Sequence, residues 1–242
     1  MTENRFPLIR MMGEDNLLVE FEAEVSREVS AKVRRLMSSL EQKRPDGYRM
    51  ALPAYRSLLV YYDPLIVDDD RMRAGVRAAL AEADEVNAAE GRLFRLPTVY
   101  GGEYGPDVAR VAALAGISAQ EVVNTAAKQK LPVYFLGFIC SQAYLGEVPK
   151  TLQAPRHASP RPLMPGGSFG FGGPQANILA VDSPSGLNYV GRTFVKVFDP
   201  ERTPPTAFRP GDFVQCPTVD VAAAREAGKR PMEDFIEPFC GR

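Results

Sequence analysis

The first hundred residues alternate between two hydrophobic periods. Apolar side chains at three- and four-residue spacing fall on one face of a helix that runs from Ser26 to the turn sequence RPDG at 44–47. The same period recurs from Met72 to Ala83, after three aspartates whose charges suit a helix N-terminus. Short apolar runs bounded by turn residues predict strands near 8–11, 17–21, 48–52, 57–62 and 93–99. The pattern predicts a small α+β domain over residues 1–100.

The pattern changes in the rest of the chain. Two short helices are predicted at 107–114 and 118–128, the second beginning with a capping box formed by Ser118 and Glu121. Of the 41 glycines and prolines, 21 lie between positions 145 and 218, where short apolar runs alternate with turn residues. Such frequent breakers predict a β-barrel or sandwich within a second domain, 101–242, with a terminal helix near 221–229.

Composition excludes several classes of protein. The 242 residues carry 29 basic and 30 acidic side chains, a net charge of -1, so the chain lacks the basic character of nucleic-acid or anionic-membrane binders. Its three cysteines never occur as C-x-x-C, so neither a disulfide framework nor a zinc site is predicted, and no other metal site is indicated. With no signal sequence and no run of eighteen apolar residues, we expect a cytoplasmic protein without a membrane partner.

The most suggestive segment for ligand binding is PRHASPRPLMPGGSFGFGGPQANI, residues 155–178. Five glycines between Gly166 and Gly173 allow consecutive backbone amides to form an anion-binding nest. No G-x-x-x-x-G-K-[ST] sequence is present, so this chain alone is not expected to bind ATP in a P-loop. The same glycines serve equally well as hairpin turns in a small barrel, and both interpretations stay open.

Three side chains outside the glycines are candidates for proton transfer or nucleophilic chemistry. His157, the single histidine, is flanked by Arg156 and Arg161, a positive setting that favours neutral imidazole; a plain surface histidine is the competing and commoner interpretation. Asp107 follows Pro106 at a helix start and is interpreted as a first-turn acid, which leaves Glu103 as the freer proton carrier. Cys140 is interpreted as a small buried hydrophobic residue.

Six ordered sequence blocks cover nearly the whole chain: LPAYRSLLVYYDP (52–64), LPTVYGGEYGPDV (96–108), YLGEVP (144–149), PRHASPRPLMPGGSFGFGG (155–173), SPSGLNYVGRTFVKVFDP (183–200) and FRPGDFVQ (208–215). Together they resemble the allophanate hydrolase subunit 1 family, which includes the B-type component of 5-oxoprolinase, a sporulation-kinase inhibitor and half of the carboxyltransferase domain of urea carboxylase. The resemblance implies a small N-terminal α+β domain followed by a C-terminal cyclophilin-like β-barrel.

The resemblance also implies an activity and partners. The expected role is that of a subunit in a heteromeric ATP-dependent 5-oxoprolinase, working with a homologous larger subunit (allophanate hydrolase subunit 2, or the C-type component of 5-oxoprolinase) and a third subunit of the A type. ATP is then used by the assembled complex, and this chain alone binds no cofactor. The alternatives are an inhibitor of a sensor histidine kinase, a carboxyltransferase-type subunit of a urea carboxylase or allophanate system, and a structural subunit whose partner supplies all the chemistry.

Carried onto matching positions, the family pattern suggests a set of site residues. Glu103 and His157 are the expected catalytic residues, and Arg161 with Arg192 is expected to pair with a substrate carboxylate. The amides of Gly166, Gly167 and Ser168 are the expected oxyanion donors. The remaining expected substrate contacts are Tyr100, Gln175 and Thr193.

The chain departs from the family pattern at a few positions. Asn124 stands where a histidine is common, and Asn188 where an aromatic residue is common. GFICSQAYLG replaces GFLPGFPYLG, and GGPQANILA replaces GGQTGIYP. We expect these changes to line the ligand site, so that the substrate differs from 5-oxoproline or catalysis is reduced.

Overall fold

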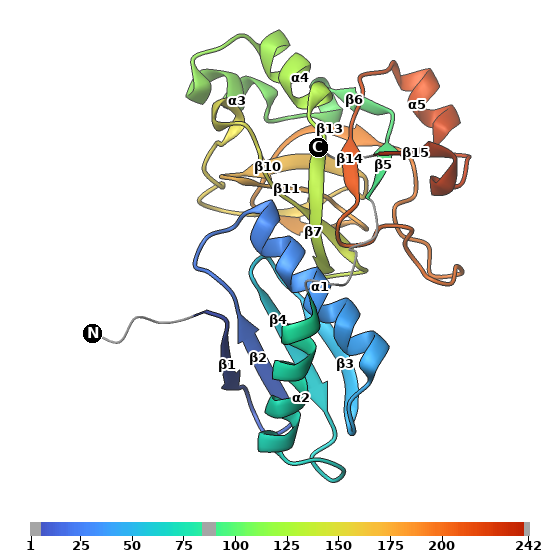
Figure 1. The fold of residues 1–242 in the computed structure, drawn as a ribbon. Coiled ribbons are helices and arrows are strands. Elements are labelled where there is room, and N and C mark those ends of the chain that lie inside the picture. The colour runs from blue at the N-terminus through green and yellow to red at the C-terminus, as the bar shows by residue number, and fades with distance from the viewer. Residues whose placement is uncertain (1–5, 84–90, 240–242) are drawn as a thin grey trace. The chain divides into compact units, whose positions relative to one another are not determined.

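The computed structural model describes residues 6–83 and 91–239 and divides the chain into two compact units, Met1–Ala89 and Glu90–Arg242 (Figure 1). The fold is mixed α+β. Each unit has a hydrophobic core of its own. Among the described residues, no helix combines the length and the apolar character needed to cross a lipid bilayer.

The first unit is one antiparallel sheet covered by two helices. The strands stand in the order β1-β2-β4-β3, and both helices lie on one face of the sheet (Figure 1). The elements are β1 (Leu8–Met11), β2 (Asn16–Glu20), α1 (Arg27–Lys43), β3 (Tyr48–Pro53), β4 (Ser57–Tyr62) and α2 (Asp69–Glu82). All of them fall where the periodicity predicted them.

Local sequence explains the bounds of the two helices. The Ser26 hydroxyl accepts a hydrogen bond from the Val29 amide at the start of α1, and Asp68 caps α2 in the same way through the Arg71 amide. Alternate residues of β2 and β4 are fully buried, and they pack against the apolar stripe of α1. The fully buried side chains of this core include Leu17, Val19, Leu36, Leu40, Leu58, Val60, Met72 and Val76.

The second unit is built on a nine-stranded sheet in the order β15-β5-β14-β7-β8-β11-β10-β13-β6, with a separate pair β12-β9. Its strands are β5 (Arg92–Arg95), β6 (Thr98–Tyr100), β7 (Leu131–Gly137), β8 (Gln142–Leu145), β9 (Arg161–Met164), β10 (Ser168–Gly172), β11 (Gln175–Ile178), β12 (Ser183–Ser185), β13 (Asn188–Thr193), β14 (Phe213–Gln215) and β15 (Ile236–Pro238). The sequence pattern assigned residues 93–99 to the N-terminal domain. In the structure, β5 and β6 pair with strands of the second unit.

In the described part of the second unit, two α-helices fall between β6 and β7 in the sequence, and a third follows β14. They are α3 (Val108–Ala115), α4 (Ala119–Lys128) and α5 (Val221–Ala227), with short 3-10 turns η2 (Gly102–Tyr104), η3 (Lys150–Leu152) and η4 (Met232–Phe235). The capping box of Ser118 and Glu121 is confirmed at the start of α4. Between 145 and 218, a range the structure describes throughout, there is no α-helix, which confirms the prediction from the glycine and proline content.

The nine-stranded sheet curls until β6, at one end of the strand order, meets the segment that follows β14 near the other end. Strands β5 and β6 are separated by two residues, yet they stand near opposite ends of the strand order. The Thr98 amide donates to the Pro217 carbonyl at 2.9 Å, and the Val219 amide donates to the Thr98 carbonyl at 3.0 Å. Curling covers the β6 edge of the sheet and encloses a core of aromatic and branched side chains.

The cysteines of the second unit differ in burial. Cys216 is 1% exposed and hydrogen-bonded to Thr98, and burial raises its pKa to about 12. Cys140 is only partly buried, so its interpretation as a buried hydrophobic residue was wrong. It lies in the turn between β7 and β8 and not in a strand. Cys240 lies outside the described residues.

This difference predicts selective thiol chemistry. Because a thiol with a pKa near 12 stays protonated at pH 8, Cys216 should react with a disulfide reagent only after unfolding, whereas Cys140 reacts in the folded protein. The measurement is the time course of thiol release in a Cys240→Ser background. Cys140→Ser should abolish the fast phase; a fast phase that survives this change contradicts the assignment.

Candidate functional site

The candidate site is a cavity of about 350 Å³ in the second unit. Its walls come from strands β8 and β11, which pair through Tyr144 and Asn177, and from the segments around Arg156 and Gly186. Its size falls in the range of small-molecule sites. The lining residues are Phe138, Gln142, Tyr144, Arg156, Pro160, Gln175, Ala176, Asn177, Leu179, Pro184, Ser185, Gly186 and Leu187.

The turn between β7 and β8 forms one side of this cavity and is strained. Phe138, Cys140 and Ser141 have positive φ angles of 55°, 50° and 53°. Left-handed backbone costs a non-glycine residue about 1–2 kcal/mol. The turn holds Phe138 71% exposed at the cavity and delivers Gln142 into it only 3% exposed. Clustered backbone strain of this kind is typical of functional sites.

Polar groups are concentrated around the cavity. The Arg156 guanidinium donates to Gln175 Oε1 at 3.0 Å. The Tyr189 hydroxyl donates to Ser185 Oγ at 2.7 Å, and burial raises the pKa of Tyr189 to about 12, so it remains a donor at neutral pH. The Tyr144 ring stacks on Phe135 with centroids 4.4 Å apart, which fixes one wall.

The second unit also contains a buried ion-pair cluster, formed by Asp107, Arg161 and His157. Asp107 is 2% exposed, and its carboxylate accepts two hydrogen bonds from Arg161, at 2.6 and 2.8 Å. The Tyr189 amide donates a further bond to Asp107 Oδ2 at 2.8 Å. Asp107 precedes α3 but forms no side-chain cap, so the interpretation as a simple helix-start acid missed its main contacts. Its partners Arg161 and Tyr189 are 54 and 82 residues away along the chain, so no local sequence pattern predicts these contacts.

His157 completes the cluster. Its Nε2 lies 3.1 Å from Asp107 Oδ1 and 3.3 Å from Arg161 Nη1. Protonated, this nitrogen donates to the aspartate; unprotonated, it accepts from the arginine. The His157 amide donates to the carbonyl of Gly186, a cavity residue. The backbone of His157 is therefore bonded to a cavity residue, whereas its ring faces Asp107 and Arg161. Arg161, expected to bind a substrate carboxylate, is paired with a carboxylate of its own chain.

The amides expected to bind an oxyanion already have acceptors. Gly166 donates to Asp182 Oδ1 at 2.7 Å, Gly167 to the Leu179 carbonyl at 2.8 Å and Ser168 to the Pro165 carbonyl at 3.2 Å. Gly167 has a φ of 80°, and a Cβ there would lie 2.1 Å from the Thr193 carbonyl oxygen. In this conformation the glycines turn the chain and let strands approach closely.

Other expected site residues lie away from the cavity. Arg192 donates to the Gly166 carbonyl at 3.0 Å and stacks over the Phe194 ring. The Tyr100 hydroxyl donates to the Cys216 carbonyl at 2.7 Å, and burial raises its pKa well above the usual value. Thr193 accepts a bond from the Val195 amide. Glu103 is exposed on η2. Of the expected set, Gln175 lines the cavity, and His157 is bonded through its backbone to the lining residue Gly186.

The family departures fall partly on this cavity. Among the altered positions, Gln142 of the first block and Gln175, Ala176 and Asn177 of the second line it. Asn188 is fully buried, where its amide donates to the Pro155 carbonyl at 3.0 Å and its oxygen accepts from Arg110 at 2.9 Å. Asn124 is exposed on α4 and bonded to Gln120.

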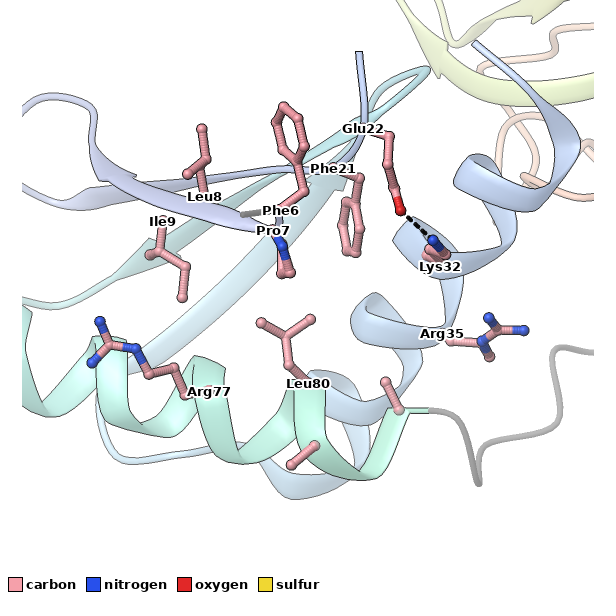
Figure 2. A pocket seen from close by; sticks show the side chains of 12 residues that line it. Phe6, Pro7, Leu8, Ile9, Phe21, Glu22, Lys32, Arg35, Arg77 and Leu80 are labelled. Atoms are coloured by element: carbon pink, nitrogen blue, oxygen red, sulfur yellow. Dashed lines mark hydrogen bonds and ion pairs between the residues drawn. The ribbon is translucent and has the colours of Figure 1, made fainter. Parts of the chain in front are cut away.

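The first unit has a separate and larger cavity of about 710 Å³ (Figure 2). Phe6, Phe21 and Leu80 converge on it from the sheet and from α2, while the ion pair between Glu22 and Lys32 lies at one end. Lys32 lowers the pKa of Glu22. None of the residues singled out in the sequence lines this cavity.

Comparison with known proteins places the chain among the carboxyltransferase-type domains. Residues 7–208 match the model of the family described as carboxyltransferase domain, subdomain C and D, and the chain belongs to that family. It is similar to the B component of the 5-oxoprolinase of Bacillus subtilis, at 32% identity over 86% of this chain and 90% of that protein. It is also similar to the Escherichia coli O157:H7 protein of the same name, at 43% identity over 55% of this chain and 62% of that protein. The resemblance seen in the sequence is confirmed.

Solved structures agree on the fold. The chain matches TTHA0988 with a TM-score of 0.74 at 29% identity, covering 88% of this chain, and it spans 40% of the length of TTHA0988. PH0987 from Pyrococcus horikoshii matches with a TM-score of 0.53 at 34% identity, over 89% of this chain and 99% of that protein. The urea carboxylase of Kluyveromyces lactis shares the fold, with a TM-score of 0.74 at 20% identity over 95% of this chain and 23% of that protein.

Proposed function

We propose that this chain is the B-type component of a heteromeric ATP-dependent 5-oxoprolinase. The observation that carries the proposal is the 32% identity to the B component of the Bacillus subtilis 5-oxoprolinase, because the match extends over 90% of that protein. The partners in the proposal are a homologous larger subunit of the C type and a third subunit of the A type. The reaction consumes ATP and is therefore assigned to the cytoplasm. We also propose that the curled sheet is a barrel of the cyclophilin-like type.

The chemistry of ATP-dependent lactam opening explains why the proposed enzyme needs more than one subunit. A lactam amide resists attack, and transfer of a phosphoryl group from ATP to the amide oxygen creates a leaving group there. This chain has no P-loop sequence, so ATP is bound elsewhere in the complex. The contribution proposed for this chain is to hold the small substrate in the 350 Å³ cavity, with proton transfer assigned to His157, whose backbone is bonded to the cavity residue Gly186.

Co-expression of the three subunits tests this proposal. The purified complex should release glutamate from 5-oxoproline only when ATP is present, and glutamate is measured directly. His157→Ala should lower kcat by about 10²-fold or more, the usual contribution of a general acid or base. Glu103→Gln should lower it only if the exposed η2 turn reaches the substrate in the complex.

Two controls separate the possible outcomes. Glu226→Gln changes another exposed carboxylate, paired only with Lys229, and should leave the rate unchanged. A complex that assembles but opens no 5-oxoproline with ATP contradicts the proposed function. A complex that is active and indifferent to both Glu103→Gln and His157→Ala contradicts the catalytic assignment alone.

A further inference from the structure

The charge of the 350 Å³ cavity suits an anion. Among the described residues that line it, Arg156 is the single charged one, with no aspartate or glutamate in the wall. In the described part of the chain, Arg156 has a hydrogen bond to Gln175 and no carboxylate partner. Gly172 brings the β10 backbone against the arginine stem, since a Cβ there would lie 3.0 Å from Arg156 Cγ. The Arg156 side chain is exposed, so the guanidinium donors that do not bond to Gln175 are open to solvent and to an anion.

The same cavity is lined by three carboxamides, Gln142, Gln175 and Asn177. Gln142 is 3% exposed, and within the described residues its Oε1 has no hydrogen-bond partner. A buried acceptor without a donor is unfavourable. Oε1 is covered by the surrounding chain, but the terminal torsion of a glutamine side chain is soft, so a small rotation turns the oxygen toward a ligand.

The shape of a carboxamide selects a matching group. Its C=O and N–H₂ lie side by side in one plane, so it can accept from one group and donate to its neighbour. A ring-held secondary amide is fixed in the cis form and presents N–H and C=O on the same edge. Such an amide satisfies Gln142 with two parallel hydrogen bonds, which an open-chain trans amide cannot do.

We propose that this cavity binds a small cyclic amide that carries a carboxylate, with Gln142 pairing to the amide edge and Arg156 to the carboxylate. Gln142 then selects against ligands without a free amide N–H, and Arg156 against ligands without the negative charge. The apolar wall of Leu179, Leu187 and Pro184 accommodates the ring carbons. The choice of 5-oxoproline as the probe rests on the proposed function; the recognition pattern itself is read from the cavity.

Three probe compounds test the two contacts separately, by titration of the isotope-labelled full chain followed by NMR. 5-Oxoproline should shift the resonances of residues 138–144, 156 and 175–179. N-methyl-5-oxoproline, which lacks the N–H, and 2-pyrrolidinone, which lacks the carboxylate, should each bind about tenfold more weakly, because each loses one of the two polar contacts.

Variants of the protein should remove these preferences one at a time. Gln142→Met should erase the preference for 5-oxoproline over its N-methyl analogue and keep the preference for the carboxylate. Arg156→Met should do the reverse. Gln120→Met and Arg71→Met alter the same residue types on exposed surface and should change nothing. The ligand analogues probe the Gln142 contact in the unaltered protein, so the test does not depend on the folding of a variant.

Failure of this inference is distinguishable from failure of the proposed function. Equal affinities for the three compounds, shifts confined to other residues, or no binding to the chain or its complex would overturn the inference even if the complex opens 5-oxoproline with ATP. Conversely, the binding pattern described above, found in a chain whose complex has no such activity, would leave the recognition site standing and remove the enzymatic role.

Discussion

Asp107→Ala is expected to lower the free energy of unfolding of the second unit by about 3 kcal/mol, because it leaves Arg161 without its carboxylate in a largely buried position. The Tyr189 amide, at a fully buried residue, loses its acceptor as well. Part of the loss is recovered, since the Arg161 side chain is 32% exposed and can be hydrated. Urea unfolding followed by circular dichroism measures the change.

The matched controls separate an ion pair from a general effect of charge. Glu226→Ala removes a carboxylate that is 69% exposed and should change stability by less than about 0.5 kcal/mol. In the double variant Asp107→Ala with Arg161→Met no unpaired charge is left, so it should be more stable than Asp107→Ala alone. If the two changes simply add, the arginine and the aspartate are not coupled and the cluster is not an energetic unit.

Gly105→Ala is expected to destabilise the second unit by about 3 kcal/mol or more. A Cβ on this residue would lie 1.9 Å from the Val190 carbonyl oxygen and 2.5 Å from the Gly101 amide nitrogen. Both obstacles are backbone atoms, so no side chain can rotate away, and the turn must separate from β13. The Gly101 amide then loses its 3.1 Å hydrogen bond to the same Val190 carbonyl.

Gly102→Ala in the same turn is the matched control. Its φ of 53° carries a left-handed penalty of about 1 kcal/mol, but a Cβ there meets nothing within 4 Å. Thermal unfolding of the two variants should therefore separate close approach from backbone conformation. Equal loss of stability in both would show that the turn depends on glycine for its φ angles alone.

Sequence patterns predicted the local elements well, for a physical reason. Strands β1 to β4 and helices α1, α2 and α4 depend on alternation, on three- and four-residue spacing and on caps within three residues, all of which are local. The membership of β5 depends instead on its parallel pairing with β14, about 120 residues later, and no periodicity contains that information. The α+β composition of the fold was therefore predictable, but the assignment of each strand to one of the two units was not.

The candidate site was predictable only in part. The segment around His157 and Gln175 stood out by composition, and both residues lie at or beside the cavity. Gln142 was not singled out, and Asp107 was interpreted only as a first-turn acid. Their importance comes from burial without a partner in the first case and from distant partners in the second. The meeting of the two altered sequence blocks at one cavity was the signal available beforehand.

The position of β14 in the sheet has a consequence for biosynthesis. This strand lies between β5 and β7, and the chain immediately after it joins the curled sheet at Thr98. The first unit can acquire its core while the remainder is still being translated, since its strands and helices all precede residue 90. The second unit cannot close its ring until residues 213–219 have emerged from the ribosome. The edges of β5 and β7 that pair with β14 therefore stay unpaired while most of the second unit is translated. During that interval we expect the nascent chain to be most prone to misassociation or chaperone binding.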